Sequence, residues 1–128
     1  MDYQLGKIDK GWGFEIIIAN NSEYCGKLLV FENVGSKTSM VLHKKHKKTW
    51  WVNEGKFKLT YIEAATGKVF ESVLGVGQIA TLAELSPHQL EALEPNSIIF
   101  EVGTSDEGDA DRIRLAPGDT QMQQPAQQ

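Results

Sequence analysis

The chain has 128 residues, 41% of them apolar, and a formal net charge of -4. This length is typical of one domain, and the apolar content is sufficient for one hydrophobic core. The acidic balance argues against a general nucleic-acid binder, which ordinarily spreads lysine and arginine along one face of a basic domain.

The sequence has no feature of a membrane-spanning or secreted chain. No run approaches the roughly 18 consecutive apolar residues of a transmembrane helix. The N-terminal stretch MDYQLGKIDKGWG lacks the apolar core of a secretory signal. The single cysteine, Cys25, cannot form an intramolecular disulfide. We therefore expect a cytoplasmic protein that binds neither membrane nor nucleic acid.

Short runs rich in β-branched and aromatic residues recur along the chain, bounded by glycine, asparagine or proline, and they predict strands. In chain order these runs are 14–19, 27–32, 49–53, 56–64, 68–74, 78–82 and 97–102. In 56–64, Phe57, Leu59 and Tyr61 alternate with polar residues and so share one face of an extended segment. The turn at 65–67 is expected to close a hairpin. Strands at this spacing indicate an all-β sandwich or barrel.

One segment departs from this pattern. The sequence SPHQLEALEP, residues 86–95, places Ser86 at a possible N-cap, Pro87 at the first helical position and Gln89 at the third. Local rules alone predict a helix here.

The chain is expected to form one domain over residues 1–116. The remaining stretch, 117–128, reads PGDTQMQQPAQQ and is rich in glutamine. It has almost nothing to bury, so the entropy of ordering it is not offset, and we expect a disordered tail.

Six consecutive basic residues, His43 to Lys48, lie between an apolar run and a pair of tryptophans. They are open to three interpretations: a strand end with a solvated turn, an anion site built on lysines such as Lys45, or a metal site. His43 and His46 differ by three positions, so on one regular strand they point to opposite sides and cannot both be ligands. Two histidines without a carboxylate neighbour do not by themselves define a metal site.

Several motifs occur in a characteristic order between Gly11 and Asp119. They are GWGFE, YCGKLLVF, SMVLHKKHKKTWWVNEG, TGKV, SPH and IIFEVGTSDEGDADRIRLAPGD. This order resembles the cupin superfamily, and within it the small single-domain proteins similar to the C-terminal cupin module of type II mannose-6-phosphate isomerases. The resemblance implies a cupin jelly-roll barrel, also called a double-stranded β-helix, and a strand rather than a helix beginning at His88.

The resemblance also implies a divalent metal such as Zn, Mn, Ni or Fe. Of the four usual ligand positions, His43 and His88 keep two, whereas Val41 and Lys48 occupy the other two. His46 could serve as a replacement ligand if the chain bulges there.

The energetic cost of a lysine at a usual ligand position can be estimated. A divalent ion about 4 Å from a charged lysine meets roughly 8 kcal/mol of repulsion at an effective dielectric near 20. Keeping the lysine neutral at pH 7 costs about 4 to 5 kcal/mol instead. Either way, we expect the usual metal to bind much more weakly than in the family.

Lys48 has two alternative orientations. If its side chain extends into the barrel, it occupies roughly the metal's place and supplies a fixed positive charge for an anionic ligand. His43 and His88 would then act as hydrogen-bond partners or acid/base groups. If the side chain points outward, it is solvated.

Two further positions are candidate ligand contacts. Trp50 and Trp51 are neighbours on a predicted strand, so one of them faces inward, for core packing or for stacking on a sugar. Arg112 resembles the arginine of the family's closing segment, where it would hold a substrate phosphate or pair with Asp109 or Asp111.

Two functions follow as hypotheses. The first is an isomerase or epimerase acting on a sugar phosphate or nucleotide sugar, with Lys48, His43 and His88 as catalytic residues. The second is a non-catalytic, metal-free module that binds a carbohydrate or small anion. In both cases Lys45, Trp50 and Arg112 are the expected ligand contacts. A homodimer is expected because the superfamily often pairs its barrels.

Overall fold

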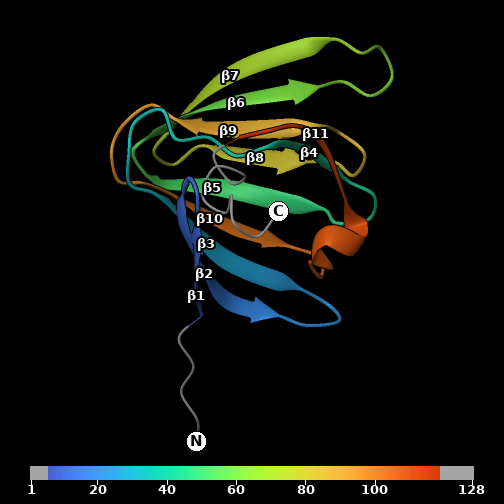
Figure 1. Cartoon of the computed structure of the whole chain (residues 1–128), viewed down its shortest axis with the longest axis horizontal. Helices are drawn as coiled ribbons and strands as arrows, with labels where there is room; N and C mark the ends of the chain where they lie inside the picture. Colours follow the sequence, from blue (N-terminus) through green and yellow to red (C-terminus); the bar gives the residue numbers. More distant parts are fainter. Residues whose placement is uncertain (1–5, 119–128) are drawn as a thin grey trace, which may run out of the picture.

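The computed structural model describes residues 6–118, which form two antiparallel β-sheets (Figure 1). The first sheet has the strand order β1-β2-β3-β10-β5-β8, and the second has the order β11-β4-β9-β6-β7. The first sheet consists of Lys7–Lys10 (β1), Gly13–Asn20 (β2), Cys25–Phe31 (β3), Ser97–Gly103 (β10), Lys48–Glu54 (β5) and Ile79–Leu82 (β8). The second consists of Arg112–Ala116 (β11), Met40–His43 (β4), His88–Ala92 (β9), Lys56–Ile62 (β6) and Val69–Gly75 (β7).

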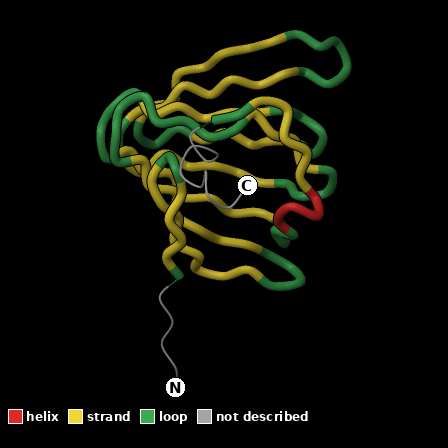
Figure 2. The backbone as a smooth tube through the Cα atoms, in the orientation of Figure 1, coloured by secondary structure: helices red, strands yellow, loops and turns green. Residues whose placement is uncertain are grey.

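Strands and loops make up nearly all of the described chain (Figure 2). A short 3-10 helix, Gly108–Asp111 (η1), precedes β11. No helix within residues 6–118 is long and apolar enough to cross a membrane. The all-β prediction is confirmed, and each of the seven predicted strand segments overlaps an observed strand. The hairpin is also present, because β6 and β7 pair from Ile62 and Val69 to Lys56 and Gly75.

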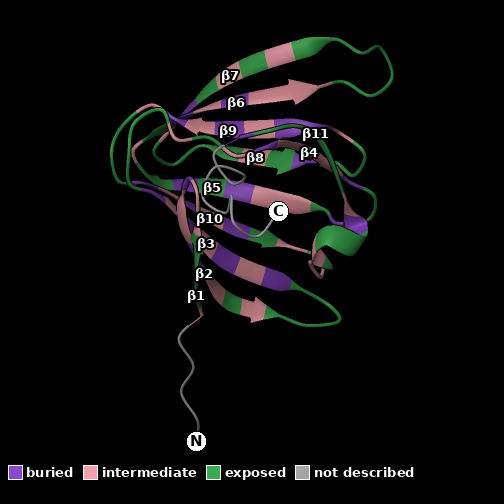
Figure 3. Cartoon of the chain, viewed as in Figure 1, coloured by how far each residue is buried: buried purple, intermediate pink, exposed green. Residues whose placement is uncertain are grey.

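The apolar core lies between the two sheets (Figure 3). Phe31 of β3 and Phe57 of β6 are fully buried, and their rings meet edge to face at 5.0 Å. Trp12 stacks on Phe31 with ring centroids 4.4 Å apart. Aromatic pairs of this geometry stabilise a core beyond the burial of their area. These contacts therefore join the two sheets at one end of the barrel.

Cross-strand registers divide the interior into an apolar layer and a polar layer. Ile99 of β10 lies opposite Leu29 and Val52, and all three are buried. Two residues farther along β10, Glu101 lies opposite Lys27, and both are also buried. Because alternate residues of a strand face the same side, the apolar core continues directly into a charged region inside the same barrel. This charged region is the candidate site.

Residues 88–92 form strand β9, so the helix that local rules predict is wrong and the strand that the resemblance implies is confirmed. Burial alternates along β9, with His88, Leu90 and Ala92 facing the interior. β9 lies between β4 and β6, and pairs with both. A helix would leave the neighbouring strands without these ladder hydrogen bonds, so tertiary pairing overrides the capping pattern.

The predicted tail begins at residue 117, and its residues 119–128 lie outside the described part of the chain. Gly118 is buried, and a side-chain carbon there would lie 2.3 Å from the carbonyl oxygen of Thr38. Within the described residues, contacts with the barrel therefore reach Gly118. This is two residues beyond the predicted end of the domain at residue 116.

Candidate functional site

A cavity of about 100 Å³ lies between the two sheets at the polar end of the interior. Its lining combines buried side chains of the barrel with more exposed ones from the edge strands β1 and β11. Five basic and three acidic residues contribute to this lining, so it carries a surplus of positive charge when the histidines are neutral. Of the residues singled out in the sequence, His43, Lys48, Trp50, His88 and Arg112 line the cavity.

The basic stretch does not continue as a strand. β4 ends at His43, and the chain bends at Lys44 and Lys45 before β5 begins at Lys48. His43 and His46 therefore do not have the opposite orientations that a regular strand would give them. His46 is buried, and its ring centroid lies 5.1 Å from that of His43.

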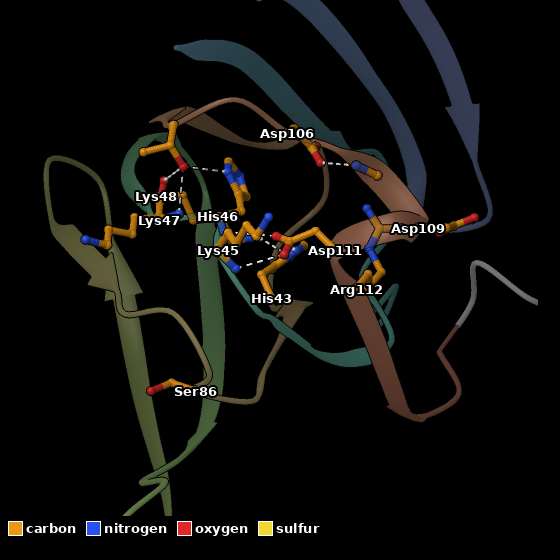
Figure 4. A network of polar contacts seen from close by, with 12 residues as sticks. His43, Lys45, His46, Lys47, Lys48, Ser86, Asp106, Asp109, Asp111 and Arg112 are labelled. Atoms are coloured by element: carbon orange, nitrogen blue, oxygen red, sulfur yellow. Dashed lines mark hydrogen bonds and ion pairs between the residues drawn. The ribbon is translucent and has the colours of Figure 1, made fainter. Parts of the chain in front are cut away.

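Asp111, at the end of η1, holds this bend in place (Figure 4). Its two carboxylate oxygens accept hydrogen bonds from the backbone N–H groups of Lys45 and His46, at 2.8 and 2.9 Å. Its backbone carbonyl accepts a third from Lys44 N–H at 3.0 Å. A buried carboxylate satisfied in this way fixes the loop that returns His46 to the interior. Lys45 itself is exposed and does not line the cavity.

Lys48 extends into the barrel and reaches His43. Its Nζ lies 3.3 Å from Nε2 of His43, and its side chain is only 10% exposed. Burial and the positive charge of Lys48 lower the pKa of His43 to about 3. His43 is therefore neutral at pH 7, and its Nε2 accepts the hydrogen bond from the ammonium of Lys48. The solvated alternative for Lys48 does not hold.

Glu101 is the counter-charge of Lys48. Its Oε1 lies 3.8 Å from Lys48 Nζ and accepts a hydrogen bond of 2.8 Å from Nε1 of Trp50. Burial by itself would raise the pKa of Glu101, but Lys48, His46 and Lys27 together hold it well below its ordinary value. Burial lowers the pKa of Lys48, and Glu101 opposes that change. The arrangement is a buried ion pair that a tryptophan N–H supports.

A second buried ammonium, that of Lys27, belongs to the same network. Its Nζ lies 2.7 Å from Asp106, 3.7 Å from Glu15 and 3.9 Å from Glu101. Burial opposes its charge, but the three carboxylates outweigh burial and raise the pKa of Lys27. This cluster does not follow from any motif of the sequence. Its one local signal is that Lys27 shares the inward face of β3 with Leu29.

His88 has one unsatisfied ring nitrogen. Its Nδ1 lies 2.9 Å from the carbonyl oxygen of Ser86, so Nδ1 carries the proton and donates it to that oxygen. Nε2 is then an acceptor, and it is buried without a hydrogen-bond partner among residues 6–118. Burial and the charge of Lys48 keep the pKa of His88 well below its ordinary value. A buried acceptor without a partner is costly, so this atom marks a position where a ligand can bond.

The side chains do not fit the metal that the resemblance implies. Within residues 6–118, no group of three or more His, Cys, Asp or Glu is placed to hold a metal ion. Val41 offers no donor, and the ammonium of Lys48 occupies the lone pair of His43 Nε2. His46 is buried beside Glu101, at 3.8 Å, and does not line the cavity. The expected ligands His43, His46 and His88 are therefore close together without forming a ligand set.

The remaining candidates separate into inward and outward side chains. Trp50 is 3% exposed, and Lys48 Nζ lies 5.1 Å from its ring centroid. Trp51 is 43% exposed on the outer face of the sheet. Arg112 lines the cavity and also lies 3.3 Å from Asp109, whose side chain is 91% exposed. Trp50 thus packs in the core and also lines the cavity. Arg112 lines the cavity and pairs with Asp109 as well.

No protein-family model matches the sequence, and no curated protein matches it. Solved structures do match the fold. Oxalate decarboxylase from Bacillus subtilis superposes with a TM-score of 0.74 at 16% identity, over 88% of this chain and 30% of that one. KdgF from Halomonas sp. superposes with a TM-score of 0.62 at 19% identity, over 86% of this chain and 90% of that one.

CapF, in complex with the inhibitor 3-isopropenyl-tropolone, superposes with a TM-score of 0.74 at 12% identity, over 90% of this chain and 35% of that one. This chain thus spans about a third of the oxalate decarboxylase and CapF chains. Together with the two antiparallel sheets, these similarities show that the chain has a cupin fold.

Proposed function

We propose that this protein is a metal-free cupin that binds a small anionic carbohydrate, such as a sugar phosphate or a sugar acid, in the cavity of its barrel. The observation that carries the proposal is the hydrogen bond of 3.3 Å between Lys48 and His43. It puts a fixed ammonium where the resemblance to type II mannose-6-phosphate isomerases expects a metal. The surplus of basic residues in the lining favours an anion.

The size of the cavity narrows the class of ligand. Its volume of about 100 Å³ is well below the roughly 300 to 1,000 Å³ of pockets that enclose drug-sized ligands. A nucleotide sugar therefore cannot be enclosed, whereas one end of a monosaccharide derivative can enter. Its lining also supports a sugar, because imidazole, ammonium and indole groups suit the hydroxyl groups and the apolar face of a sugar ring.

Calorimetric titration tests the proposal, with mannose 6-phosphate, glucose 6-phosphate and gluconate as probes and with EDTA present throughout. We expect saturable binding of at least one probe, and loss of that binding in Lys48→Met. Lys47→Met is the matched control, because Lys47 is exposed and pairs only with Glu84 among the described residues. Binding of no anionic carbohydrate would reject the proposal, as would binding that appears only when the EDTA is replaced by Zn, Mn, Ni or Fe.

A second function, an isomerase or epimerase, is favoured by one observation. A charged donor, Lys48, and a neutral acceptor, His43, lie in contact inside the cavity. On binding, Lys48 would turn from His43 to polarise the carbonyl of an open-chain sugar. Nε2 of His43, released from that hydrogen bond, would move a proton between adjacent carbons.

Turnover of mannose 6-phosphate, followed by NMR, distinguishes the two functions. Loss of turnover in His43→Ala with retained fold and ligand binding would support the enzyme. Binding of mannose 6-phosphate by the wild type without turnover would support the non-catalytic binding module.

A further inference from the structure

The basic residues of the cavity lie at two depths. The side chains of Lys27 and Lys48 are only 8% and 10% exposed and form the floor. Lys10 and Arg112 are partly exposed and Arg114 is exposed. These three are at the rim, because Lys10 ends β1 and the two arginines belong to β11, the edge strands of their sheets.

The charges of the floor are already balanced. Lys27 lies within 4 Å of Glu15, Glu101 and Asp106, and Lys48 lies within 4 Å of Glu101. Three carboxylates therefore face two ammonium groups. An anion placed at the floor would meet the ionised Glu101 and would compete with it for the same ammonium groups.

The charges of the rim are not balanced. Among residues 6–118, the side chains of Lys10 and Arg114 form neither an ion pair nor a hydrogen bond. Within the described part of the chain Arg112 pairs only with Asp109, and an ion pair with so exposed a carboxylate contributes little. In the register of β11 with β4, Arg112 lies opposite His43 and Arg114 lies opposite Val41, so both arginines flank cavity-lining residues. The surplus positive charge of the cavity is thus at its rim.

The floor offers groups that match a hydroxyl. Nε2 of His88 is an acceptor without a partner among the described residues, whereas Lys48 is a donor. A hydroxyl both donates and accepts, so it can bond to the two groups together, whereas a carboxylate or phosphate dianion cannot donate to His88.

We propose that the ligand is a carbohydrate with one terminal anionic group, a phosphate or a carboxylate, which Lys10, Arg112 and Arg114 bind at the rim. Its hydroxylated end points inward to His88 and Lys48. This orientation rests on the proposed function. It assigns the anion to the edge strands and changes the role of Lys48 from anion receptor to hydroxyl donor.

Titration of the Arg114→Met and Lys68→Met variants tests the orientation. Both substitutions remove one exposed positive charge, and Lys68, in the β6–β7 hairpin, is remote from the cavity lining. We expect Arg114→Met to weaken mannose 6-phosphate binding about tenfold or more, as for a lost charge-assisted hydrogen bond, and to leave binding of neutral mannose unchanged. Lys68→Met should change neither.

A parallel titration with mannonate shows whether the rim accepts a carboxylate as well as a phosphate. The His88→Phe variant should weaken mannose and mannose 6-phosphate by the same factor, because it acts on the shared hydroxylated end. Equal affinity of Arg114→Met and wild type for mannose 6-phosphate would overturn the orientation and keep the proposed function. Absence of binding by any of these carbohydrates to the wild type would overturn both.

A separate observation concerns the outer face of the six-stranded sheet. The strand registers align five apolar residues in one row across five strands, each directly opposite the next. The row consists of Ile79, Trp51, Phe100, Leu28 and Ile16. Ile79 is 67% exposed and Trp51 is 43% exposed. Phe100, Leu28 and Ile16 are partly exposed. A contiguous apolar row that reaches the surface along its whole length marks an interaction surface.

The outer face of the other sheet is different. There Lys58 of β6 forms ion pairs with Glu71 of β7 and Glu91 of β9, as expected of a sheet that faces water on one side. The first sheet instead has continuous apolar runs, such as residues 16–19 and 28–31, which are typical of strands covered on both faces.

We infer that a second copy of this chain covers the apolar row. The row carries no charge, so two chains with a net charge of -4 can meet there without opposing like charges. Residues 1–5 contain three large apolar residues and residues 119–128 contain one, so neither segment matches the five apolar residues of the row. Five strands about 4.8 Å apart make the row about 19 Å long, and strands of seven residues extend the face to about 20 Å in the other direction. Two such faces total about 800 Å², less than the roughly 1,000 Å² of a stable specific interface, which predicts a weak and reversible dimer.

Sedimentation equilibrium over a range of micromolar concentrations tests this interface. We expect a concentration-dependent dimer for the wild type and a monomer for Trp51→Glu. Val73→Glu is the matched control, because Val73 is 58% exposed on β7 of the other sheet, and it should stay dimeric. A monomeric wild type, or a dimeric Trp51→Glu variant, contradicts the inference. Dimerisation that appears only after deletion of residues 119–128 would identify that segment as the cover instead.

Discussion

Nζ of Lys48 lies 3.3 Å from Nε2 of His43, so the ammonium occupies the lone pair through which the imidazole would bind a metal. Val41 lines the same cavity with an apolar side chain at the other position where the family motif places a ligand. Both departures from the motif therefore lie in one cavity. The proposed metal-free site rests on them, and their reversal can be tested.

The double variant V41H/K48E is expected to gain a stoichiometric divalent metal. It would add two ligand side chains to His43 and His88, which makes four, and would remove the repulsion of roughly 8 kcal/mol between a divalent ion and the lysine. Elemental mass spectrometry and thermal-shift titration with Zn, Mn, Ni and Fe measure the gain. The same variant with His88→Ala should lose it. A folded double variant that binds no metal would show that the backbone, and not these two side chains, prevents binding.

Stability is expected to fall as the pH falls from about 6.5 toward 3. The pKa of His43 is about 3 in the folded protein against an ordinary value of 6.5, so in this range the unfolded chain binds a proton that the folded chain does not. The pKa of His88 is also lowered in the folded protein, so His88 contributes to the same loss of stability at low pH. Urea denaturation at several pH values measures the slope. His43→Gln should flatten it, and an unchanged slope in that variant would contradict the assignment.

Asp111→Asn is expected to destabilise the protein by about 1 to 3 kcal/mol. The amide keeps one acceptor oxygen where the carboxylate uses two to bind the N–H groups of Lys45 and His46. Chemical denaturation measures the loss, and faster hydrogen exchange at these two amides locates it. Asp109→Asn is the control, since its side chain is 91% exposed and should cost little. Equal effects of the two variants would mean that Asp111 does not hold the loop.

Gly55→Ala is expected to destabilise the protein more than Gly67→Ala. Both glycines have positive φ, 79° and 74°, so both substitutions incur left-handed backbone strain of about 1 to 2 kcal/mol. Only at Gly55 would the added carbon meet a neighbour, 2.0 Å from Oγ of Ser97, which adds about 1 to 3 kcal/mol of overpacking. The midpoints of thermal unfolding for the two variants measure the difference. Equal midpoints would mean that Ser97 moves aside freely.

The sequence predicted the fold wherever one strand carried its own pattern. Phe57 and Leu59 alternate with polar residues because β6 has one buried face and one wet face. β1 and β11 were not predicted, because their inner positions carry charged residues such as Lys10 and Arg112, which face the cavity instead of the core. Strands that line a polar site lose the apolar alternation by which strands are recognised.

The candidate site was predicted in part. His43, Lys48 and His88 were found because a family motif fixes their spacing, and the structure places all three around the cavity. The cluster around Lys27 was missed, because Glu15 and Asp106 are brought to it only by the pairing of β3 with β2 and β10 and by the loop after β10. Rules that use only neighbouring residues cannot predict the contact between Lys27 and Asp106, which are 79 positions apart. Such charge clusters become visible only once strand register is known.

Because the central cation of the cavity is a side chain, the site is ready as soon as the barrel has closed. Lys48 needs no loading step, no delivery protein and no supply of a scarce element, and a chelator cannot remove it. Its occupancy is the same in every copy of the chain. What the protein gives up is exchange, because a bound ion can be swapped to change reactivity, whereas a lysine can be altered only by mutation or covalent modification.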